Sequence, residues 1–123
     1  MRGRLLFILF LGVAAVAEDE RGFLGFQPSF VAKPAKGVAI QYVFPDGPAG
    51  KAGLVAGDVI LKYNGQDAPN AKEHDDESLQ TAFMKLAATV KAGQDVEIVV
   101  EREGKPVTLK AHAISKDDMD KLV

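Results

Sequence analysis

The densest group of chemically active side chains runs from Glu73 to Glu77 and places the imidazole of His74 among four carboxylates. Such groups are ligands for divalent ions. Five contiguous side chains cannot all converge on one ion, and acidic residues at the start of a helix are stabilised by the helix dipole without a metal. We therefore expect no metal here, with a divalent-ion site as the alternative.

Nucleophilic catalysis has little support in the sequence. A serine nucleophile needs a His and an Asp in contact with it, but the chain has only three Ser, two His and no Gly-x-Ser-x-Gly segment. The absence of Cys excludes disulfides, thiol catalysis and cysteine-bound zinc, and two His cannot form a multi-histidine centre. We expect a protein that is not an enzyme and has no cofactor.

The composition is that of one small globular domain. The chain has 123 residues, of which 47% are apolar and 26% are charged, and its net charge is −2. This net charge argues against a protein that binds nucleic acid, because such a protein needs a basic face.

Residues 1–17 have the pattern of a cleaved signal peptide. Arg2 and Arg4 precede an apolar run of about twelve residues that ends in Ala15-Val16-Ala17, and an acidic segment follows. The run is too short to span a bilayer, which takes roughly 20 residues. We predict export to the periplasm or the medium, a mature chain of residues 18–123, and no stable membrane insertion after cleavage; an uncleaved anchor or an N-terminal core helix is the alternative.

The remainder alternates strand-like and helical segments. β-Branched and aromatic residues predict strands at 37–44, 59–63, 96–102 and 106–112. Pro48 fits the first turn of a short helix that Gly53 ends, and Asn64-Gly65 is a strong hairpin signal. Ser115 with Asp118 predicts one last short helical turn, inside a solvated acidic tail.

One longer helix carries an apolar stripe at helical spacing, formed by Leu79, Phe83, Leu86 and Val90. The acidic residues 75–77 favour a start there, and Lys91 with Gly93 favours an end. Asn70 with Glu73 is a possible capping box and gives an alternative start.

Residues 46–61 followed by Asn64-Gly65 resemble the signature of bacterial PDZ domains, SPAxxAGLxxGDxIxxxNG. The local physics agrees with the motif. Gly53 ends a short helix abruptly, Leu54 enters the core, and Gly57-Asp58 turns tightly into a buried strand.

A second segment, Arg21-Gly22-Phe23-Leu24-Gly25-Phe26, resembles the carboxylate-binding loop of PDZ domains in HtrA/Deg proteases. The order of loop, motif, long helix and last hairpin is also that of bacterial PDZ domains. The resemblance covers about residues 21–113, leaves a short tail at 114–123, and implies an α+β, mostly β fold. We expect a partly open barrel or sandwich of five to six strands with two helices.

The resemblance implies a peptide-binding site. Because the predicted loop directly follows the predicted signal peptide, we expect no protease domain and do not expect the catalytic activity of HtrA proteases. The amides of Leu24, Gly25 and Phe26 would hold a terminal carboxylate, and the peptide would add as a strand beside residues 26–28, against the long helix. The predicted carboxylate loop is Arg21, Gly22, Phe23, Leu24, Gly25 and Phe26, and the predicted groove is Gln27, Pro28, Phe83 and Ala87. Plain core packing is the alternative for Phe83, solvation is the alternative for Arg21, and Leu86 and Val90 are expected in the core.

Two features qualify this site. Pro28 stands where the family usually offers a second N–H, so strand addition is expected to be short and affinity modest. The chain ends in Leu122 and Val123, the kind of terminus such a groove accepts, so binding between copies is an alternative to a loose or packed tail.

The predicted function is that of an exported adaptor for protein or peptide C-termini or extended segments. An envelope protease or a misfolded client chain would be its partner. The alternatives are a structural domain that docks a fixed partner with its groove unused, and a non-catalytic regulatory remnant of an HtrA-like protease.

Overall fold

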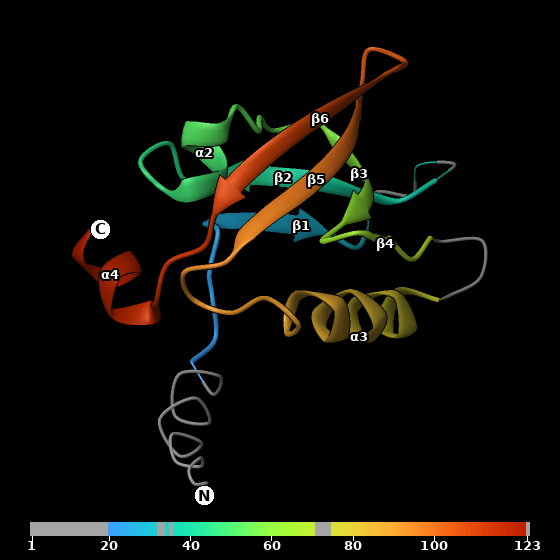
Figure 1. The fold of residues 1–123 in the computed structure, drawn as a ribbon. Coiled ribbons are helices and arrows are strands. Elements are labelled where there is room, and N and C mark those ends of the chain that lie inside the picture. Colours follow the sequence, from blue (N-terminus) through green and yellow to red (C-terminus); the bar gives the residue numbers. More distant parts are fainter. Residues whose placement is uncertain (1–19, 32–33, 35, 71–74, 123) are drawn as a thin grey trace, which may run out of the picture.

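The computed structural model describes residues 20–31, 34, 36–70 and 75–122. They form a six-stranded antiparallel sheet with three helices packed around it (Figure 1). In chain order the elements are β1 (Phe26–Ser29), β2 (Val38–Val43), α2 (Pro48–Ala52), β3 (Val59–Tyr63), β4 (Gln66–Asp67), α3 (Asp76–Ala87), β5 (Asp95–Arg102), β6 (Lys105–His112) and α4 (Lys116–Lys121). The predicted mostly β class and open sheet are confirmed. Beside the two expected helices, α4 forms where one short helical turn was predicted.

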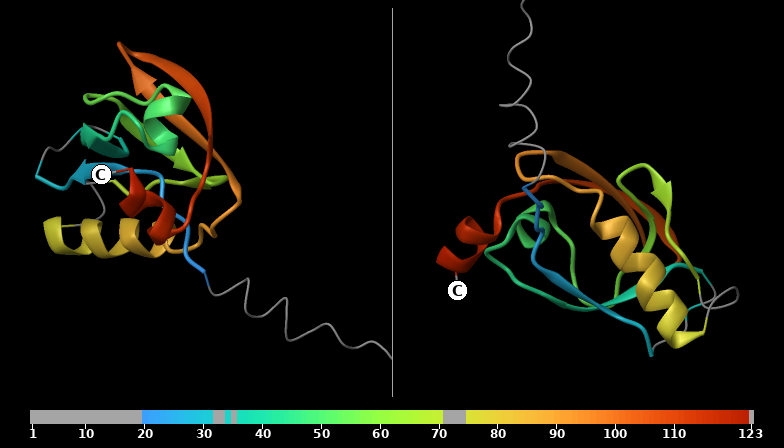
Figure 2. Two further views of the ribbon diagram at one scale, coloured as in Figure 1. Left: turned by 90° about the vertical axis from the view of Figure 1, so that its left-hand side faces the viewer. Right: turned by 90° about the horizontal axis from the view of Figure 1, so that it is seen from below.

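The strand order is β1-β2-β3-β5-β6, with β4 paired to β3. β1 is therefore an edge strand, and α3 runs along it in each view (Figures 1 and 2). The long β5–β6 hairpin forms the other end of the sheet. Because β1 leaves one side unpaired beside a helix, this edge is the place where another strand could be added.

The core lies between the sheet and α3. Every second residue of β5 from Val96 to Val100 is buried, and α3 buries Leu79, Phe83 and Leu86 on one face. This follows from the period of two in a strand and of 3.6 in a helix. Each isolated element would expose an apolar face, and packing them together removes that area from water.

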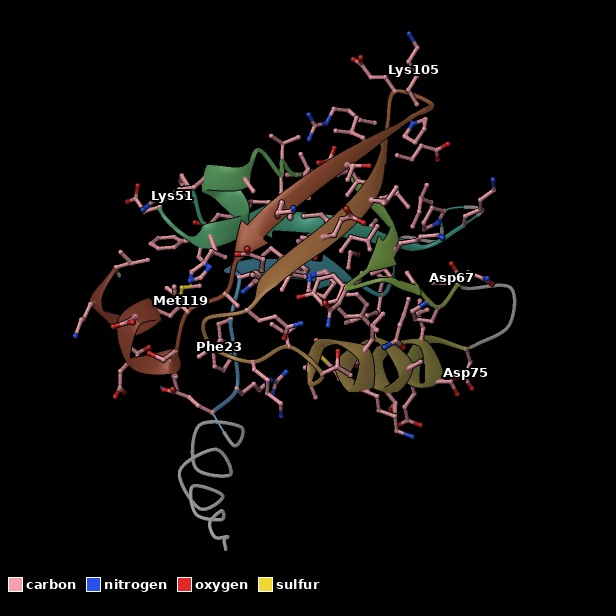
Figure 3. The ribbon with its side chains drawn as sticks, viewed as in Figure 1. Phe23, Lys51, Asp67, Asp75, Lys105 and Met119 are labelled. Atoms are coloured by element: carbon pink, nitrogen blue, oxygen red, sulfur yellow. The ribbon has the colours of Figure 1, made fainter. Side chains whose placement is uncertain are left out.

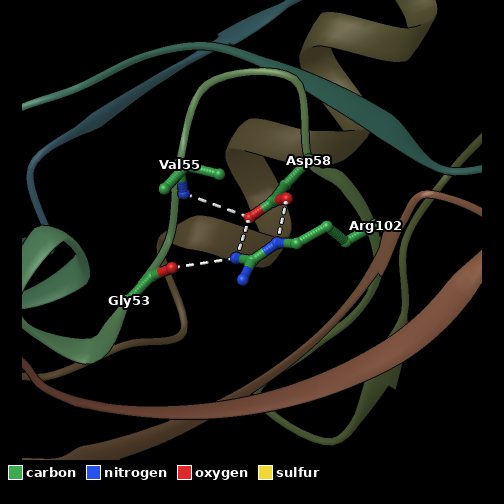
Figure 4. A network of polar contacts seen from close by, with 4 residues as sticks. All are labelled: Gly53, Val55, Asp58 and Arg102. Atoms are coloured by element: carbon green, nitrogen blue, oxygen red, sulfur yellow. Dashed lines mark hydrogen bonds and ion pairs between the residues drawn. The ribbon is translucent and has the colours of Figure 1, made fainter.

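The segment between α2 and β3 is held by one buried carboxylate, that of Asp58, whose side chain is 1% exposed (Figure 4). Arg102 of β5 donates to both of its oxygens, at 2.8 and 2.7 Å, and Val55 N donates at 3.1 Å. Arg102 also donates to the Gly53 carbonyl at 2.8 Å. Burial alone would raise the pKa of Asp58, but these hydrogen bonds and the Arg102 charge outweigh it and lower the pKa.

Most predicted elements are present within a residue or two of their expected bounds. The main difference is the end of the long helix, which stops at Ala87 instead of continuing toward Lys91. The Thr89 hydroxyl donates to Leu86 O at 2.7 Å, and Val90 is buried after the helix rather than on it. The start favoured by acidic residues is confirmed, because Asp75 accepts from Ser78 N at 2.7 Å. Glu73, needed for the alternative start, lies outside the described residues, as do residues 1–17.

Candidate functional site

The loop that enters β1 is anchored on two sides before it reaches the strand. Gly22 N donates to Val90 O at 2.9 Å, just after α3. Phe23 and Ile114 exchange two backbone hydrogen bonds, at 2.8 and 3.1 Å. A Cβ on Gly22 would lie 2.6 Å from the Lys91 backbone, so only glycine allows this close approach.

The next amides are free to bind something else. Leu24 N and Gly25 N donate to no group in the described part of the chain. Phe44 N donates to Gly25 O at 2.9 Å, and Phe26 stands opposite Val43 in the ladder. Because backbone groups alternate sides along a strand, the N–H of Phe26 points away from β2, toward the unpaired edge. Three successive donors are therefore left without a partner in the sheet.

A pocket of about 180 Å³ opens beside these amides, between the loop, β1 and α3. Nine of the ten predicted site residues line it; Gln27 does not, and it is exposed. Tyr63 and Met84 also line it, although they were not predicted. Met84 could have been found from helix geometry, since it lies three residues before Ala87. Tyr63 comes from another strand, and no local signal points to it.

Phe83 is part of the core and of the pocket wall at once. Its side chain is 2% exposed, and its ring packs at centroid distances of 5.6 to 6.3 Å against Phe26, Phe30 and Tyr63. The two interpretations of Phe83 are therefore not exclusive. Its neighbours Leu86 and Val90 are buried, as expected.

Arg21 is exposed and lines this pocket, with its guanidinium carbon 5.4 Å from the centroid of the Phe23 ring. Burial raises the pKa of Tyr63, and the positive charge of Arg21 partly opposes that rise. The positive charge of Arg21 therefore lies on the same side of the fold as the free amides. A cation in this position attracts an anion toward the loop.

The outer edge of β1 is interrupted. The register with β2 shifts between Gln27 and Pro28, and Pro28 has no N–H to offer. Beyond Phe26, the next residue expected to face outward therefore contributes a carbonyl but no donor. This geometry agrees with the expectation of short strand addition, which stays a prediction.

The C-terminal segment packs against the loop that precedes β1, so it is not simply a solvated tail. Ser115 caps α4 by accepting from Asp118 N at 3.1 Å, as predicted. Met119 lies on the side of α4 turned toward the sheet (Figure 3), and a Cβ on Gly25 would be 2.5 Å from its terminal methyl carbon. Leu122 lines a separate pocket of about 330 Å³ between α2 and β6 in its own molecule, which favours the packed alternative for the tail.

Among the described residues, no three acidic or histidine side chains lie close enough together to hold a metal ion. Glu73 and His74 of the acidic run lie outside that part of the chain, and Asp75 is the cap of α3. His112 instead contacts Asp95 at 2.8 Å on the surface. No helix in the described ranges is long and apolar enough to cross a membrane.

The sequence matches the profile of the PDZ domain over residues 10–112. The chain belongs to the PDZ domain family. Serine endoprotease DegS of Haemophilus influenzae is 34% identical over 85 residues, which are 69% of this chain and 22% of that protein. A probable periplasmic DegP-like serine endoprotease of Pseudomonas putida is 39% identical over 90 residues, 72% of this chain and 17% of the relative.

Solved structures agree with this PDZ assignment. The HtrA-type protease AlgW with a decapeptide has a TM-score of 0.55 and 27% identity, covering 79% of this chain and 30% of AlgW. The PDZ domain of HtrA3 bound to a phage-derived ligand, FGRWV, has a TM-score of 0.52 and 20% identity, covering 76% of this chain and 85% of that domain, and shows likeness of fold alone. The PDZ domain here is of the HtrA type and is a non-catalytic module. The chain spans about a fifth of the curated relatives it matches.

Proposed function

We propose that this PDZ domain binds the free C-terminus of an extended peptide, with the carboxylate held by the amides of Leu24, Gly25 and Phe26. The observation that carries the proposal is this row of amides beside a pocket, two of them without an acceptor in the described chain and the third facing the unpaired edge. Converging backbone donors form a concave anion site. Gly25, at φ +83°, gives the loop the turn that aims them together.

The peptide would lie between β1 and α3 as an added strand antiparallel to β1, because its carboxylate is held at the N-terminal end of β1. Its last side chain would enter the pocket beside Leu24 and Phe83, while Arg21 draws the carboxylate from a distance. Affinity would come from main-chain bonds and specificity from the pocket. Because Pro28 lacks an N–H, residues far from the peptide terminus would add little. The decapeptide in the AlgW complex shows that a related protein holds a peptide, which supports the proposal.

The test compares one peptide in two forms. A pentapeptide ending in Val is titrated into the protein as a free acid and as a C-terminal amide, by calorimetry at low and moderate salt. We expect the free acid to bind at least tenfold more tightly, because the amide removes the charge that the donors stabilise. Equal affinity of the two forms would rule out carboxylate recognition.

We further propose that the domain acts outside the cytoplasm as an adaptor for a protease or a misfolded chain. The leader-like residues 1–17 and the relatives named as periplasmic support this placement. Mass spectrometry of the protein recovered from cell fractions should show a mature N-terminus at Glu18. A full-length cytoplasmic form would contradict export.

A further inference from the structure

The pocket wall contains one buried polar side chain, Tyr63, for which the described part of the chain offers no hydrogen-bond partner. Tyr63 is 3% exposed, its ring packs against Phe26 and Phe83 at centroid distances of 6.1 and 5.6 Å, and it lines the pocket beside the free amides. In the described chain no group forms a hydrogen bond with its hydroxyl. The chain's other tyrosine, Tyr42, is 49% exposed on β2 and lies outside this pocket.

This hydroxyl is a neutral donor under ordinary conditions, because burial raises the pKa of Tyr63. A buried hydroxyl without a partner costs roughly 1–3 kcal/mol. The cost falls when a bound molecule brings a hydrogen-bonding group to it, and it persists when an apolar group takes the same place. Apart from the exposed Arg21, the other side chains that line the pocket, among them Leu24, Phe26, Phe83 and Ala87, are apolar. Apart from Arg21 and the free backbone amides, Tyr63 is therefore the one polar group among the described residues that line the pocket.

Granting the proposed function, we infer that Tyr63 selects peptides whose last side chain carries a hydroxyl beside an apolar group, with Thr as the best match. The pocket, of about 180 Å³, has room for a Thr side chain. The Thr methyl would contact the aromatic wall, and its hydroxyl would exchange a hydrogen bond with Tyr63. Val has the same shape but would leave the Tyr63 hydroxyl unsatisfied. A site built around a hydrogen bond discriminates more strongly than an apolar wall alone.

The experiment uses the peptides FGRWT and FGRWV, each as a free acid and as an amide, against three proteins. These are the unchanged chain, Tyr63→Phe, and the matched control Tyr42→Phe. We expect the unchanged chain to prefer the acid ending in Thr over the acid ending in Val. Tyr63→Phe should lower the Thr-to-Val affinity ratio by roughly three- to tenfold, as expected for one net hydrogen bond, while Tyr42→Phe leaves the ratio unchanged.

The outcomes separate the two proposals. Tight binding of the acids with a Thr-to-Val ratio that Tyr63→Phe does not change would overturn the role of Tyr63 and leave carboxylate binding intact. Equal binding of acids and amides would overturn carboxylate recognition itself. Thermal unfolding adds a second readout: Tyr63→Phe should unfold at the same or a higher temperature, because the hydroxyl has no partner in the free protein. A clear loss of stability would show an internal partner and contradict the inference.

Discussion

The terminal methyl of Met119, in α4, occupies the space beside Gly25 in the carboxylate loop, so a Cβ on Gly25 would lie 2.5 Å from it. The same C-terminal segment holds Phe23 through the two backbone hydrogen bonds of Ile114. If the loop is mobile in the free protein, binding an anion must first order it. That ordering costs free energy and lowers the affinity for the anion. The C-terminal segment therefore helps to hold the loop amides in the positions from which they would donate.

Substitution of Gly25 by Ala should weaken both folding and binding. Alanine at φ +83° costs about 1–2 kcal/mol of stability. The added Cβ must also displace Met119, which loosens the support of the loop, and we expect at least a fivefold loss of affinity for a free-acid peptide. Calorimetry and thermal unfolding measure the two effects.

Gly65→Ala is the matched control, because Gly65 has nearly the same φ, +82°, and no atom near its missing Cβ. It should lose similar stability and keep its affinity. In a Met119→Ala background, Gly25→Ala should cost less affinity than in the unchanged chain, since the clash is gone. Additive effects of the two substitutions would show that Met119 does not act through Gly25.

Ala87→Leu should block the pocket with little effect on folding. Ala87 is half-buried where α3 faces the loop, so a larger side chain there takes the space proposed for the last peptide residue. We expect at least a tenfold loss of affinity. Ala82→Leu, at a half-buried position on another side of α3, should bind as the unchanged chain does. Equal losses in both variants would mean that the peptide lies elsewhere.

Pro28→Ala should help long peptides and not short ones. Restoring an N–H at this position offers the incoming strand a further donor beyond Phe26. We expect the affinity of a free-acid hexapeptide to rise two- to fivefold, while that of a tripeptide stays constant. Isothermal titration of both lengths decides the matter, and no gain for the hexapeptide would show that Pro28 does not limit strand addition.

The stability of the fold should depend on the ionised form of Asp58. Its pKa is lowered below the ordinary value of 3.8, so its contribution is complete above about pH 4 and is lost as pH falls through the folded-state pKa. Asp58→Asn should cost roughly 2 kcal/mol at neutral pH, because it removes the charge from a buried, hydrogen-bonded group. Urea unfolding from pH 7 to pH 2 should show a smaller acid loss in Asp58→Asn than in the unchanged chain. Parallel pH curves would contradict this role of Asp58.

The parts of the site that the sequence predicted are those with local signals. Gly25 and Gly53 mark backbone conformations that few other residues adopt, and the stripe containing Phe83 marks the buried face of a helix. The parts that it did not predict depend on contacts between distant segments. Tyr63 reaches the pocket only because β3 lies beside α3, and Met119 reaches Gly25 only because the hairpin β5–β6 returns the chain end to the loop. The residues that flank Tyr63 and Met119 in the sequence form no pattern that predicts either contact.

The proposed peptide binding depends most on Leu24, Gly25 and Phe26 donating to a carboxylate. The direct measurement is an NMR titration of ¹⁵N-labelled protein with one pentapeptide as a free acid and then as its amide. We expect the proton signals of these three backbone amides to shift far downfield with the acid, and much less with the amide. Unmoved signals for the three amides at saturation with the acid would contradict the proposed peptide binding.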